Sequence, residues 1–383
     1  MRKLVFCVGQ LIEPGGTERV LANKVNYLSS IGYEIIIITV NQKQNKYFYN
    51  FNSKIKFYDI TYEKPKFLIH PFLFIRNIIY FRKEYNKLLK KIQPDIVTVN
   101  ERGYLDFIIP FISKHIPKIR EFHSSQKAIK LHITQMNSII SRLRHKIMYS
   151  FLYKIFNKYD YLVLLTKSDY NESDYKTNVE IIPNMHKPIV LQKSKLENKK
   201  VISVGSMNGN IKRFDLQIMI WHNIIQKNKD LNDWSLHIYG DGKNRLRLQK
   251  KINKLGLEKH IFLHGKSKNL YKHYLDSSIF IFTSIGEGFG MVLVEAMSYG
   301  LPCVSFNCPH GPSEIIDNNN DGFLIKNDDI IEFEKKLTLL MKDDKLRKNM
   351  GKNAYSNSKR FCPKQIGLKW NDLYNKILKH SKL

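Results

Sequence analysis

The sequence predicts an α/β protein made of two domains, each with a doubly wound parallel sheet. Continuous apolar runs of strand length alternate with segments of helical periodicity, and such uniformly apolar runs are typical of strands buried on both faces. The chain has 383 residues, enough for two domains that each bury a core. A polar, proline-containing stretch from 187 to 200 separates the two series of strands and is the expected linker.

The first domain is predicted over residues 1–190. Gly15 and Gly16 lie in the loop after its first strand, and a helical pattern follows them to Leu28. The alternation of strand and helix predicts a parallel sheet covered by helices on both faces. The expected strands are LVFCVG (4–9), EIIIITV (34–40), DIVTVN (95–100), KIREFH (118–123), YLVLLT (161–166) and VEIIPN (179–184).

The second domain is predicted over residues 191–364, again with helices between its strands. A further helix, which contains Trp370 and Tyr374, is expected over residues 365–383 after Pro363. The expected strands are KKVISVGS (199–206), WSLHIYG (234–240), HIFLHG (260–265), SIFIFTS (278–284), PCVSFN (302–307) and GFLI (322–325).

Composition excludes several classes of protein. A hydrophobic content of 43% with 12% aromatic residues argues against disorder. No run reaches the 18 or so apolar residues of a membrane span, and the short apolar start leads to Glu-Pro-Gly-Gly instead of a signal-peptide cleavage site. We therefore expect a cytoplasmic protein. Without a CxxC pair, its four cysteines are expected to be reduced core residues: Cys7, Cys303, Cys308 and Cys362.

The formal net charge of +29 indicates an acidic partner. Eight Lys or Arg face two acids around residues 63–91, and the segment between Phe122 and Tyr159 has no Asp or Glu. Apolar residues recur at helical spacing in the second segment, which predicts a basic amphipathic helix. Two interpretations stay open: the helix lies on an anionic membrane surface, or its apolar stripe is ordinary core. Nucleic acid is not expected, because no motif for its recognition accompanies the charge.

The most informative feature follows the strand at 278–284. Gly286-Glu287-Gly288-Phe289-Gly290 leads into an apolar helix over 291–298, and Glu295 lies eight positions after Glu287. Glycines let the backbone approach a ligand, and a helix N-terminus favours an anion. Two carboxylates would repel a phosphate unless they reach past it to neutral hydroxyls. A ligand with a sugar on either side of a diphosphate, such as a nucleotide sugar, has this arrangement. The alternative is a buried strand-to-helix turn with one solvated Glu.

Residues 283–325, TSIGEGFGMVLVEAMSYGLPCVSFNCPHGPSEIIDNNNDGFLI, closely resemble the donor-binding segment of the family 4 retaining glycosyltransferases. The likeness is greatest to the bacterial branch that builds exopolysaccharide, O-antigen and lipid-linked oligosaccharide, which shares the words E-G-F-G, E-A-M, G-x-P and G-P-S-E-I-I. This resemblance implies a GT-B fold, in which two Rossmann-like domains face each other across a cleft. It also implies that the helix at 365–383 crosses back to the first domain.

The resemblance assigns roles to particular residues. Glu295 is expected to hold the ribose hydroxyls, Glu287 the donor sugar near its O3, and His123 to touch the donor sugar. Lys212 and the amides of Gly288, Phe289 and Gly290 are expected to stabilise the diphosphate as the leaving phosphate gains charge. The remaining candidates are Gly15 and Gly16, at the family's N-terminal glycine loop, and Asp241, in its G-D-G turn near the nucleotide.

The chain departs from the family pattern at Ser206, where relatives usually carry an arginine that grips the diphosphate. Arg213 stands where relatives often have glycine. Three alternatives remain: Arg213 substitutes for the missing arginine, Lys212 and the loop amides hold the diphosphate alone, or Arg213 is a solvated charge.

Together these features predict a retaining transferase that moves a hexose or N-acetylhexosamine from a nucleotide diphosphate sugar, with uridine as the expected base, to a glycan acceptor. The acceptor is expected to be lipid-linked, at the inner face of the cell membrane. No Asp-x-Asp pair is present, so neither a metal nor another cofactor is expected. Neither domain has a G-x-G-x-x-G fingerprint after its first strand, which argues against a nicotinamide dehydrogenase. The other alternative is a non-catalytic nucleotide-sugar-binding or membrane assembly protein.

Overall fold

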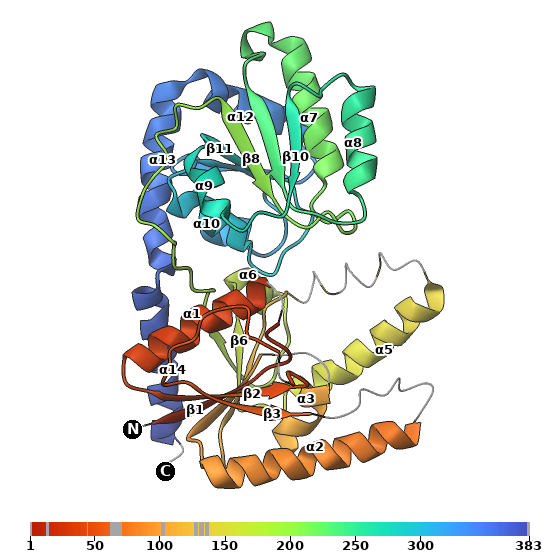
Figure 1. The fold of residues 1–383 in the computed structure, drawn as a ribbon, viewed down its shortest axis with the longest axis vertical. Helices are drawn as coiled ribbons and strands as arrows, with labels where there is room; N and C mark the ends of the chain where they lie inside the picture. The colour runs from red at the N-terminus through yellow and green to blue at the C-terminus, as the bar shows by residue number, and fades with distance from the viewer. Residues whose placement is uncertain are drawn as a thin grey trace. The chain divides into compact units, whose positions relative to one another are not determined.

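The computed structural model of the chain describes residues 2–12, 15–43, 45–61, 71–100, 104–125, 129, 134 and 138–380. The chain divides into two compact units (Figure 1). Unit 1 comprises Met1–Met185 and Pro363–Leu383, and unit 2 comprises His186–Cys362. Relative to the predicted divisions after residues 190 and 364, the structure assigns residues 186–190 to unit 2 and residues 363–364 to unit 1.

Unit 1 contains a parallel sheet with the order β3-β2-β1-β4-β5-β6-β7. Every predicted strand segment of the first domain overlaps one of these strands. The apolar runs among them, such as β2 and β6, are easy to recognise because they are buried on both faces. The prediction missed β3, an edge strand whose KFYDI sequence is half exposed. The strands are β1 (Lys3–Cys7), β2 (Glu34–Val40), β3 (Lys56–Ile60), β4 (Ile96–Val99), β5 (Lys118–Glu121), β6 (Tyr161–Leu164) and β7 (Asn178–Ile181).

The terminal helix α14 (Pro363–His380) packs in unit 1 against α1 (Gly16–Ser30). The α14 backbone packs directly against the Tyr27 ring of α1 at Gly367, where a Cβ atom would lie 1.9 Å from that ring. Trp370 and Tyr374 are buried on the inner face of α14. The other helices of unit 1 are α2 (Pro71–Ile92), α3 (Tyr104–Ile108), α5 (Ile139–Phe156) and α6 (Lys167–Asn171), with a 3₁₀ turn at Ile109–Phe111.

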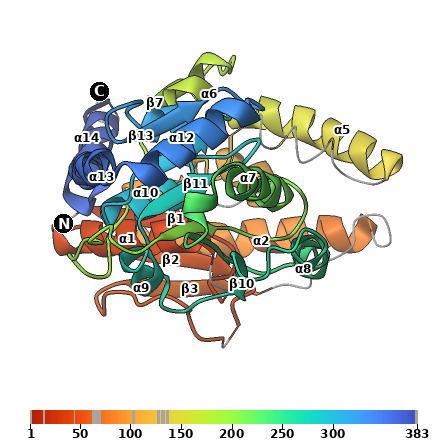
Figure 2. The same ribbon diagram turned by 90° about the horizontal axis from the view of Figure 1, so that it is seen from above.

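Unit 2 contains a second parallel sheet, with the order β10-β9-β8-β11-β12-β13. Each segment predicted as a strand in the second domain contains one of them. Helices cover both faces of the sheet, as the view from above also shows (Figure 2). The strands are β8 (Lys200–Val204), β9 (Ser235–Tyr239), β10 (Ile261–Gly265), β11 (Ile279–Phe282), β12 (Cys303–Phe306) and β13 (Gly322–Ile325).

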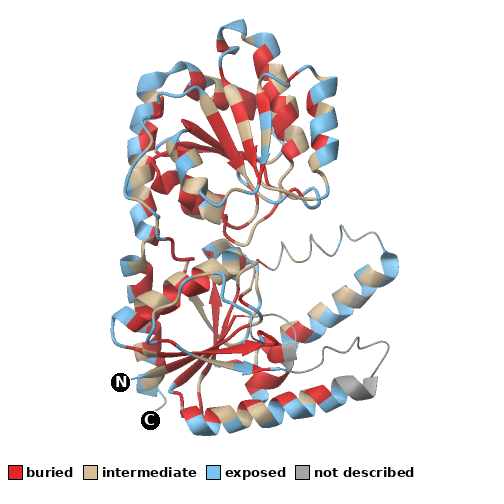
Figure 3. Cartoon of the chain, in the orientation of Figure 1, coloured by how far each residue is buried: buried red, intermediate tan, exposed pale blue. Residues whose placement is uncertain are grey.

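The main core of unit 2 lies between this sheet and α7 and α12, and Trp221, Phe306 and Phe333 are among its buried side chains. Figure 3 shows that the central strands are buried while the outer helix faces are exposed. The helices are α7 (Phe214–Lys227), α8 (Arg245–Lys254), α9 (Leu270–Leu275), α10 (Met291–Ser298), α11 (Pro312–Ile315), α12 (Ile330–Lys342) and α13 (Asp344–Ser358). Two 3₁₀ turns complete the unit at Lys229–Leu231 and Lys359–Phe361.

Both units have the doubly wound, Rossmann-like architecture that the sequence predicts. The strand order reverses between β1 and β4 in unit 1 and between β8 and β11 in unit 2. Open sheets of this kind bind ligands beyond the carboxyl ends of the strands at such a reversal. Within the described ranges, no helix combines the length and apolarity needed to span a bilayer.

Candidate active site

The loops after β8 and β11 meet at the strand reversal of unit 2. Thr283, which follows β11, is buried and donates its hydroxyl hydrogen to the carbonyl oxygen of Lys212 at 2.8 Å. The amide of Ile285 donates to the carbonyl oxygen of Ile211 at 3.0 Å. Gly290, the N-cap residue of α10, then adopts a left-handed conformation with φ of +97°. These contacts fix the glycine loop 286–290 against the loop that carries Lys212.

The Lys212 ammonium lies 2.5 Å from Oε1 of Glu287, so the structure brings together two of the three predicted catalytic side chains. Both side chains are partly exposed, at 22% for Lys212 and 14% for Glu287. The ammonium also lies 5.2 Å from the centre of the Phe282 ring. Glu287 belongs to the glycine loop that leads into α10, so this loop combines a carboxylate and its paired cation with free-standing glycine amides, which suits a ligand with both phosphate and hydroxyl groups.

Close backbone packing explains the glycines around Lys212. A Cβ atom on Gly240 would lie 1.8 Å from the carbonyl oxygen of Gly205, and one on Gly205 would lie 3.1 Å from the Lys212 side chain. Asp241 shapes the same turn: its carbonyl oxygen accepts from the amide of Met207 at 2.9 Å, and its carboxylate accepts from the amide of Gly242 at 2.8 Å. The structure thus shows Asp241 holding the turn that supports the Lys212 loop.

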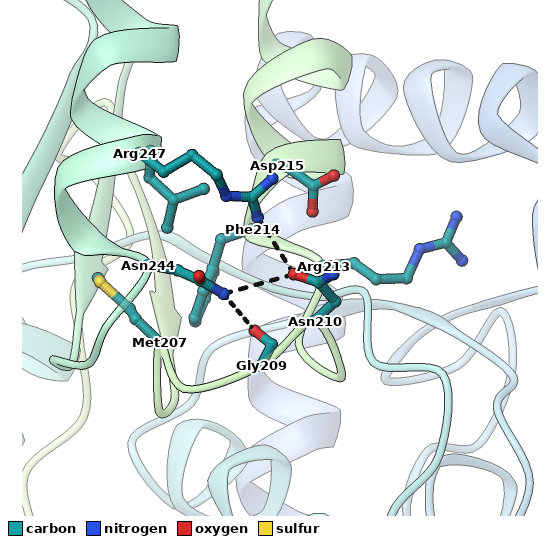
Figure 4. Close-up of a pocket in the computed structure, with 9 residues that line it drawn as sticks. Met207, Gly209, Asn210, Arg213, Phe214, Asp215, Asn244 and Arg247 are labelled. Carbon is teal, nitrogen blue, oxygen red and sulfur yellow. Dashed lines mark hydrogen bonds between the residues drawn. The ribbon is translucent and has the colours of Figure 1, made fainter. Parts of the chain in front are cut away.

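The loop before Arg213 is held by the start of α8 (Figure 4). Asn244 donates to the carbonyl oxygen of Gly209 at 2.8 Å, and Arg247 donates to the side-chain oxygen of Asn210 at 3.1 Å. The Arg213 side chain extends away from these residues (Figure 4), and its guanidinium donates to Asp328 at 2.5 Å. The structure therefore places Arg213 in an ion pair with Asp328, which none of the three alternatives describes.

Glu295 lies in α10 and is only 3% exposed. Its Oε2 accepts a hydrogen bond from the Tyr274 hydroxyl of α9 at 3.3 Å. Glu295 and Glu287 therefore have different surroundings, because one carboxylate is buried beneath an aromatic hydroxyl and the other pairs with an ammonium at the loop surface.

A second loop supports the glycine loop, and sequence reasoning did not assign it a role. A Cβ atom on Gly311 would lie 1.9 Å from the carbonyl oxygen of Phe289, so this contact requires glycine. Burial, together with the charge of Glu287, raises the pKa of the Cys308 thiol to about 12, so the thiol is protonated. The only sequence signal for this loop was the Cys-Pro-His-Gly-Pro word inside the family resemblance.

In unit 1, His123 follows β5 and belongs to a buried polar network. Its Nε2 lies 3.2 Å from the side-chain nitrogen of Asn100 and 3.8 Å from a carboxylate oxygen of Glu121. Glu121 also accepts hydrogen bonds from Asn100 and from the buried ammonium of Lys24. Burial alone would raise the pKa of Glu121, but Lys24, His123 and Asn100 together lower it, so Glu121 is ionised.

The same network borders a cavity at the strand reversal of unit 1. Gly15 lies just before α1, and its carbonyl oxygen accepts from the Tyr49 hydroxyl at 3.0 Å. The space around Gly16 is open, since a Cβ atom there would meet nothing within 4 Å. The cavity has a volume of about 130 Å³ and is lined by Val8, Gly9, Gln10, Leu11, Thr17, Glu18, Leu21 and Asn100.

Sequence reasoning missed Asn100, Glu121 and Lys24. Weak signals existed, because Asn100 directly follows β4 and Glu121 is the last residue of β5, so both lie at the carboxyl ends of parallel strands. Among the residues that the structure describes, no cluster of three or more His, Cys, Asp or Glu side chains is arranged to hold a metal ion.

Both halves of the chain match known families. Residues 14–185 match the family described as Glycosyltransferase Family 4, and residues 189–357 match Glycosyl transferases group 1. The chain belongs to the family 4 glycosyltransferases. It is therefore a glycosyltransferase with the GT-B fold, as the family resemblance of residues 283–325 implies.

Relatives of this family 4 glycosyltransferase span its full length. It is 27% identical to the amylovoran biosynthesis glycosyltransferase AmsD of Erwinia amylovora over 388 aligned residues, which cover 98% of this chain and 100% of AmsD. It is 26% identical to an α-1,4-N-acetyl-D-galactosaminyltransferase of Campylobacter jejuni that acts on an undecaprenol-linked glycan, with 97% of each chain covered.

Among solved structures, the protein resembles TarM of S. aureus, crystallised as a mutant in complex with fondaparinux, α-GlcNAc-glycerol and UDP. The TM-score is 0.77 at 19% identity, over 98% of this chain and all of the TarM chain. At this identity the likeness supports the fold and leaves the ligands of this chain to be inferred from its own residues.

Proposed function

We propose that the protein is a retaining glycosyltransferase of bacterial surface polysaccharide biosynthesis. It transfers a hexose or N-acetylhexosamine from a UDP-sugar to a glycan acceptor carried on a lipid. The observation that carries this proposal is the Lys212–Glu287 pair beside the glycine loop, at the strand reversal of unit 2.

In this proposal the diphosphate lies against the Lys212 ammonium and the amides of Gly288, Phe289 and Gly290. Negative charge grows on the phosphate oxygen as its bond to the sugar breaks, and positive groups already in place stabilise that charge; one such donor can contribute roughly 3 to 4 kcal/mol. Lys212 and the amides supply this stabilisation from the protein itself, so we propose activity without a divalent ion. Arg213 is not needed, because its guanidinium pairs with Asp328.

Glu287 accepts hydrogen bonds from hydroxyls of the donor sugar, beside the Lys212 ammonium. Glu295 holds the ribose, oriented by the Tyr274 hydroxyl. For the transfer itself we propose attack on the face that the phosphate leaves. The bond from the anomeric carbon to phosphate breaks, the acceptor oxygen bonds the same carbon, and the leaving phosphate takes the acceptor proton. No carboxylate nucleophile is then required.

The choice of donor and acceptor draws support from the relatives. TarM was crystallised with UDP, the Campylobacter relative acts on an undecaprenol-linked glycan, and the Erwinia relative serves amylovoran biosynthesis. The net charge of +29 agrees with a location of the enzyme at an anionic lipid surface. We therefore propose that the protein is peripheral to the inner face of the cell membrane.

The proposal is tested first by ligand binding. UDP should raise the thermal midpoint of the protein more than GDP, by an amount that grows with ligand concentration, since ligand at a hundred times its Kd stabilises the folded state by about 2.7 kcal/mol. Slow release of UDP from a panel of UDP-sugars should then identify the donor, and excess EDTA should leave that rate unchanged. Lys212→Gln should lose both the thermal shift with UDP and the release of UDP from the donor, whereas the matched surface variant Lys250→Gln in α8 should keep them.

Two outcomes contradict the proposal in different ways. Binding of UDP without hydrolysis or transfer from any donor would favour a non-catalytic nucleotide-sugar-binding protein. Loss of activity in EDTA that magnesium or manganese restores would show that a metal, and not Lys212 alone, neutralises the diphosphate.

A further inference from the structure

Helix α5 exposes an unusual number of large apolar side chains. Its buried anchors, Leu152 and Phe156, lie near its C-terminus and pack into the core of unit 1. Ile140 is 80% exposed, and five further apolar side chains of the helix are also exposed: Ile139, Leu143, Ile147, Met148 and Phe151. Soluble monomeric proteins rarely expose so many large apolar side chains on one helix. Most of the stripe that the sequence predicts is therefore not core.

Helix α2 repeats this arrangement. Phe81, Tyr85 and Leu89 are buried in the later turns, whereas Ile75 and Ile79 are exposed near the N-terminus. The two views agree that the N-terminal halves of α2 and α5 project on the same side of unit 1 (Figures 1 and 2). Together the exposed apolar residues of these halves form what we call the α2/α5 surface.

Positive charge accompanies the apolar side chains. Helix α5 contains no Asp or Glu and exposes Arg142 and Lys146 next to Leu143 and Ile147. Helix α2 exposes Arg76 in its N-terminal half, and its later turns expose five more basic residues against one acid, Glu84: Arg82, Lys83, Lys87, Lys90 and Lys91. A protein partner would need a surface that is both apolar and acidic to complement these helices, whereas an anionic bilayer offers both negative headgroups and an apolar layer beneath them.

We infer that the α2/α5 surface docks on an anionic lipid membrane. The apolar side chains enter the boundary between headgroups and acyl chains, and the basic side chains contact the phosphates. Burial of the apolar side chains holds the helices within the interfacial layer of the bilayer. The contacts between basic side chains and phosphates make the attachment depend on ionic strength. The inference rests on the proposed function for its purpose, which is to bring the enzyme to an acceptor carried on lipid. Its evidence is independent of the nucleotide site.

The test is sedimentation of the full chain with vesicles. Wild type should sediment with vesicles of phosphatidylglycerol and phosphatidylcholine at low salt, and release as salt rises. Arg142→Gln with Lys146→Gln should weaken this attachment roughly twenty-fivefold, since each basic residue near an anionic surface is worth about a factor of five. Leu143→Ser with Ile147→Ser should weaken binding by at least about tenfold and leave the remaining binding more sensitive to salt.

The matched control is Leu246→Ser with Lys250→Gln in α8, a basic helix of unit 2 with one strongly exposed leucine. Equal weakening by the control pair would overturn the inference, as would wild type that stays in solution at every salt concentration. The molar mass in solution should also be measured. If wild type is a dimer that the α5 variants dissociate, and it does not bind vesicles, the surface contacts a second copy of the chain and the inference is overturned. A UDP thermal shift run in parallel separates failure of docking from failure of the proposed function.

Discussion

At the scale of single residues, the two glutamates of the glycine-loop region differ in environment and should differ in effect. Glu287→Ala should lower kcat by about a hundredfold with a small change in KM for the donor, because it removes a contact to the reacting sugar. Glu295→Ala should mainly raise that KM, because it removes a buried contact to the distant ribose. Steady-state release of UDP measures both constants. Indistinguishable, negligible effects of the two substitutions would refute the assignment.

Tyr274→Phe is the control for Glu295. It removes the hydroxyl that donates to Oε2 and leaves the carboxylate in place. A smaller rise in KM than that of Glu295→Ala is expected, since the carboxylate keeps its charge but loses one orienting hydrogen bond.

A second prediction concerns the buried polar network that contains His123, Glu121 and Lys24. Glu121→Gln removes the charge that compensates the buried Lys24 ammonium, and leaving one partner of a buried pair uncompensated costs about 3 to 5 kcal/mol of unfolding free energy. Adding Lys24→Met should recover much of the loss, because no buried charge then remains. Urea unfolding of the two variants measures this. A double variant that is less stable than Glu121→Gln would show that Lys24 stabilises unit 1 by other contacts, such as its position 4.1 Å from the Trp370 ring centre.

At the scale of elements, the loop after β12 supports the loop after β11. Gly311→Ala should displace the glycine loop, because its φ of +128° strains an L residue and its Cβ atom would clash with Phe289. We expect lower stability together with weaker UDP binding, measured by thermal shifts with and without UDP. Gly256→Ala is the matched control: its φ is +65° but a Cβ atom there has open space, so it should cost about 1 kcal/mol and spare UDP binding.

The edge of the second sheet contains stacked rings of several titratable side chains. His237 of β9 stacks on His264 of β10, and their ring nitrogens lie 2.8 Å apart. Tyr239 stacks between His264 and His273, which belongs to α9. Burial, followed by the proximity of His264, lowers the pKa of His237 to about 4. The stack is therefore neutral at physiological pH.

This stack predicts a dependence of stability on pH. Above the unfolded value of 6.5 His237 is neutral in both states, so it adds no dependence. As pH falls from 6.5 to about 4, the unfolded chain takes up a proton that the folded chain does not, and the free energy of unfolding falls. Urea midpoints across this range should decline less steeply for His237→Gln. An unchanged slope in that variant would assign the acid sensitivity to other groups.

At the scale of the whole molecule, the sequence predicts elements better than their arrangement. Strands such as β2 and β11 were predictable because burial on both faces makes them uniformly apolar. The order of strands, which places the Lys212 and Glu287 loops side by side, depends on contacts between distant segments that periodicity does not encode. The Lys24–Glu121 pair joins residues 97 positions apart, and the Arg213–Asp328 pair joins residues 115 apart.

The terminal helix provides a prediction for the whole chain. Removal of residues 363–383 should destabilise unit 1, since α14 buries Trp370 and Tyr374 against it, and burial of one large aromatic side chain contributes about 3 to 5 kcal/mol by comparison with alanine. Unit 2 ends at Cys362 and should retain its UDP-dependent thermal shift. Two unfolding transitions in the full chain, of which only one responds to the truncation, would match this expectation. Equal loss in both units would contradict it.

The division of unit 1 into two stretches of chain also sets an order of events during synthesis. Residues 186–362 form one uninterrupted stretch, so unit 2 can fold as soon as that stretch has left the ribosome. Synthesis of unit 1 begins first, but folding of unit 1 is completed last, because α1 lacks its packing partner until α14 has been synthesised. The growing chain therefore exposes the hydrophobic surface that α14 later covers. This surface stays accessible to chaperones for the whole time that unit 2 is being translated.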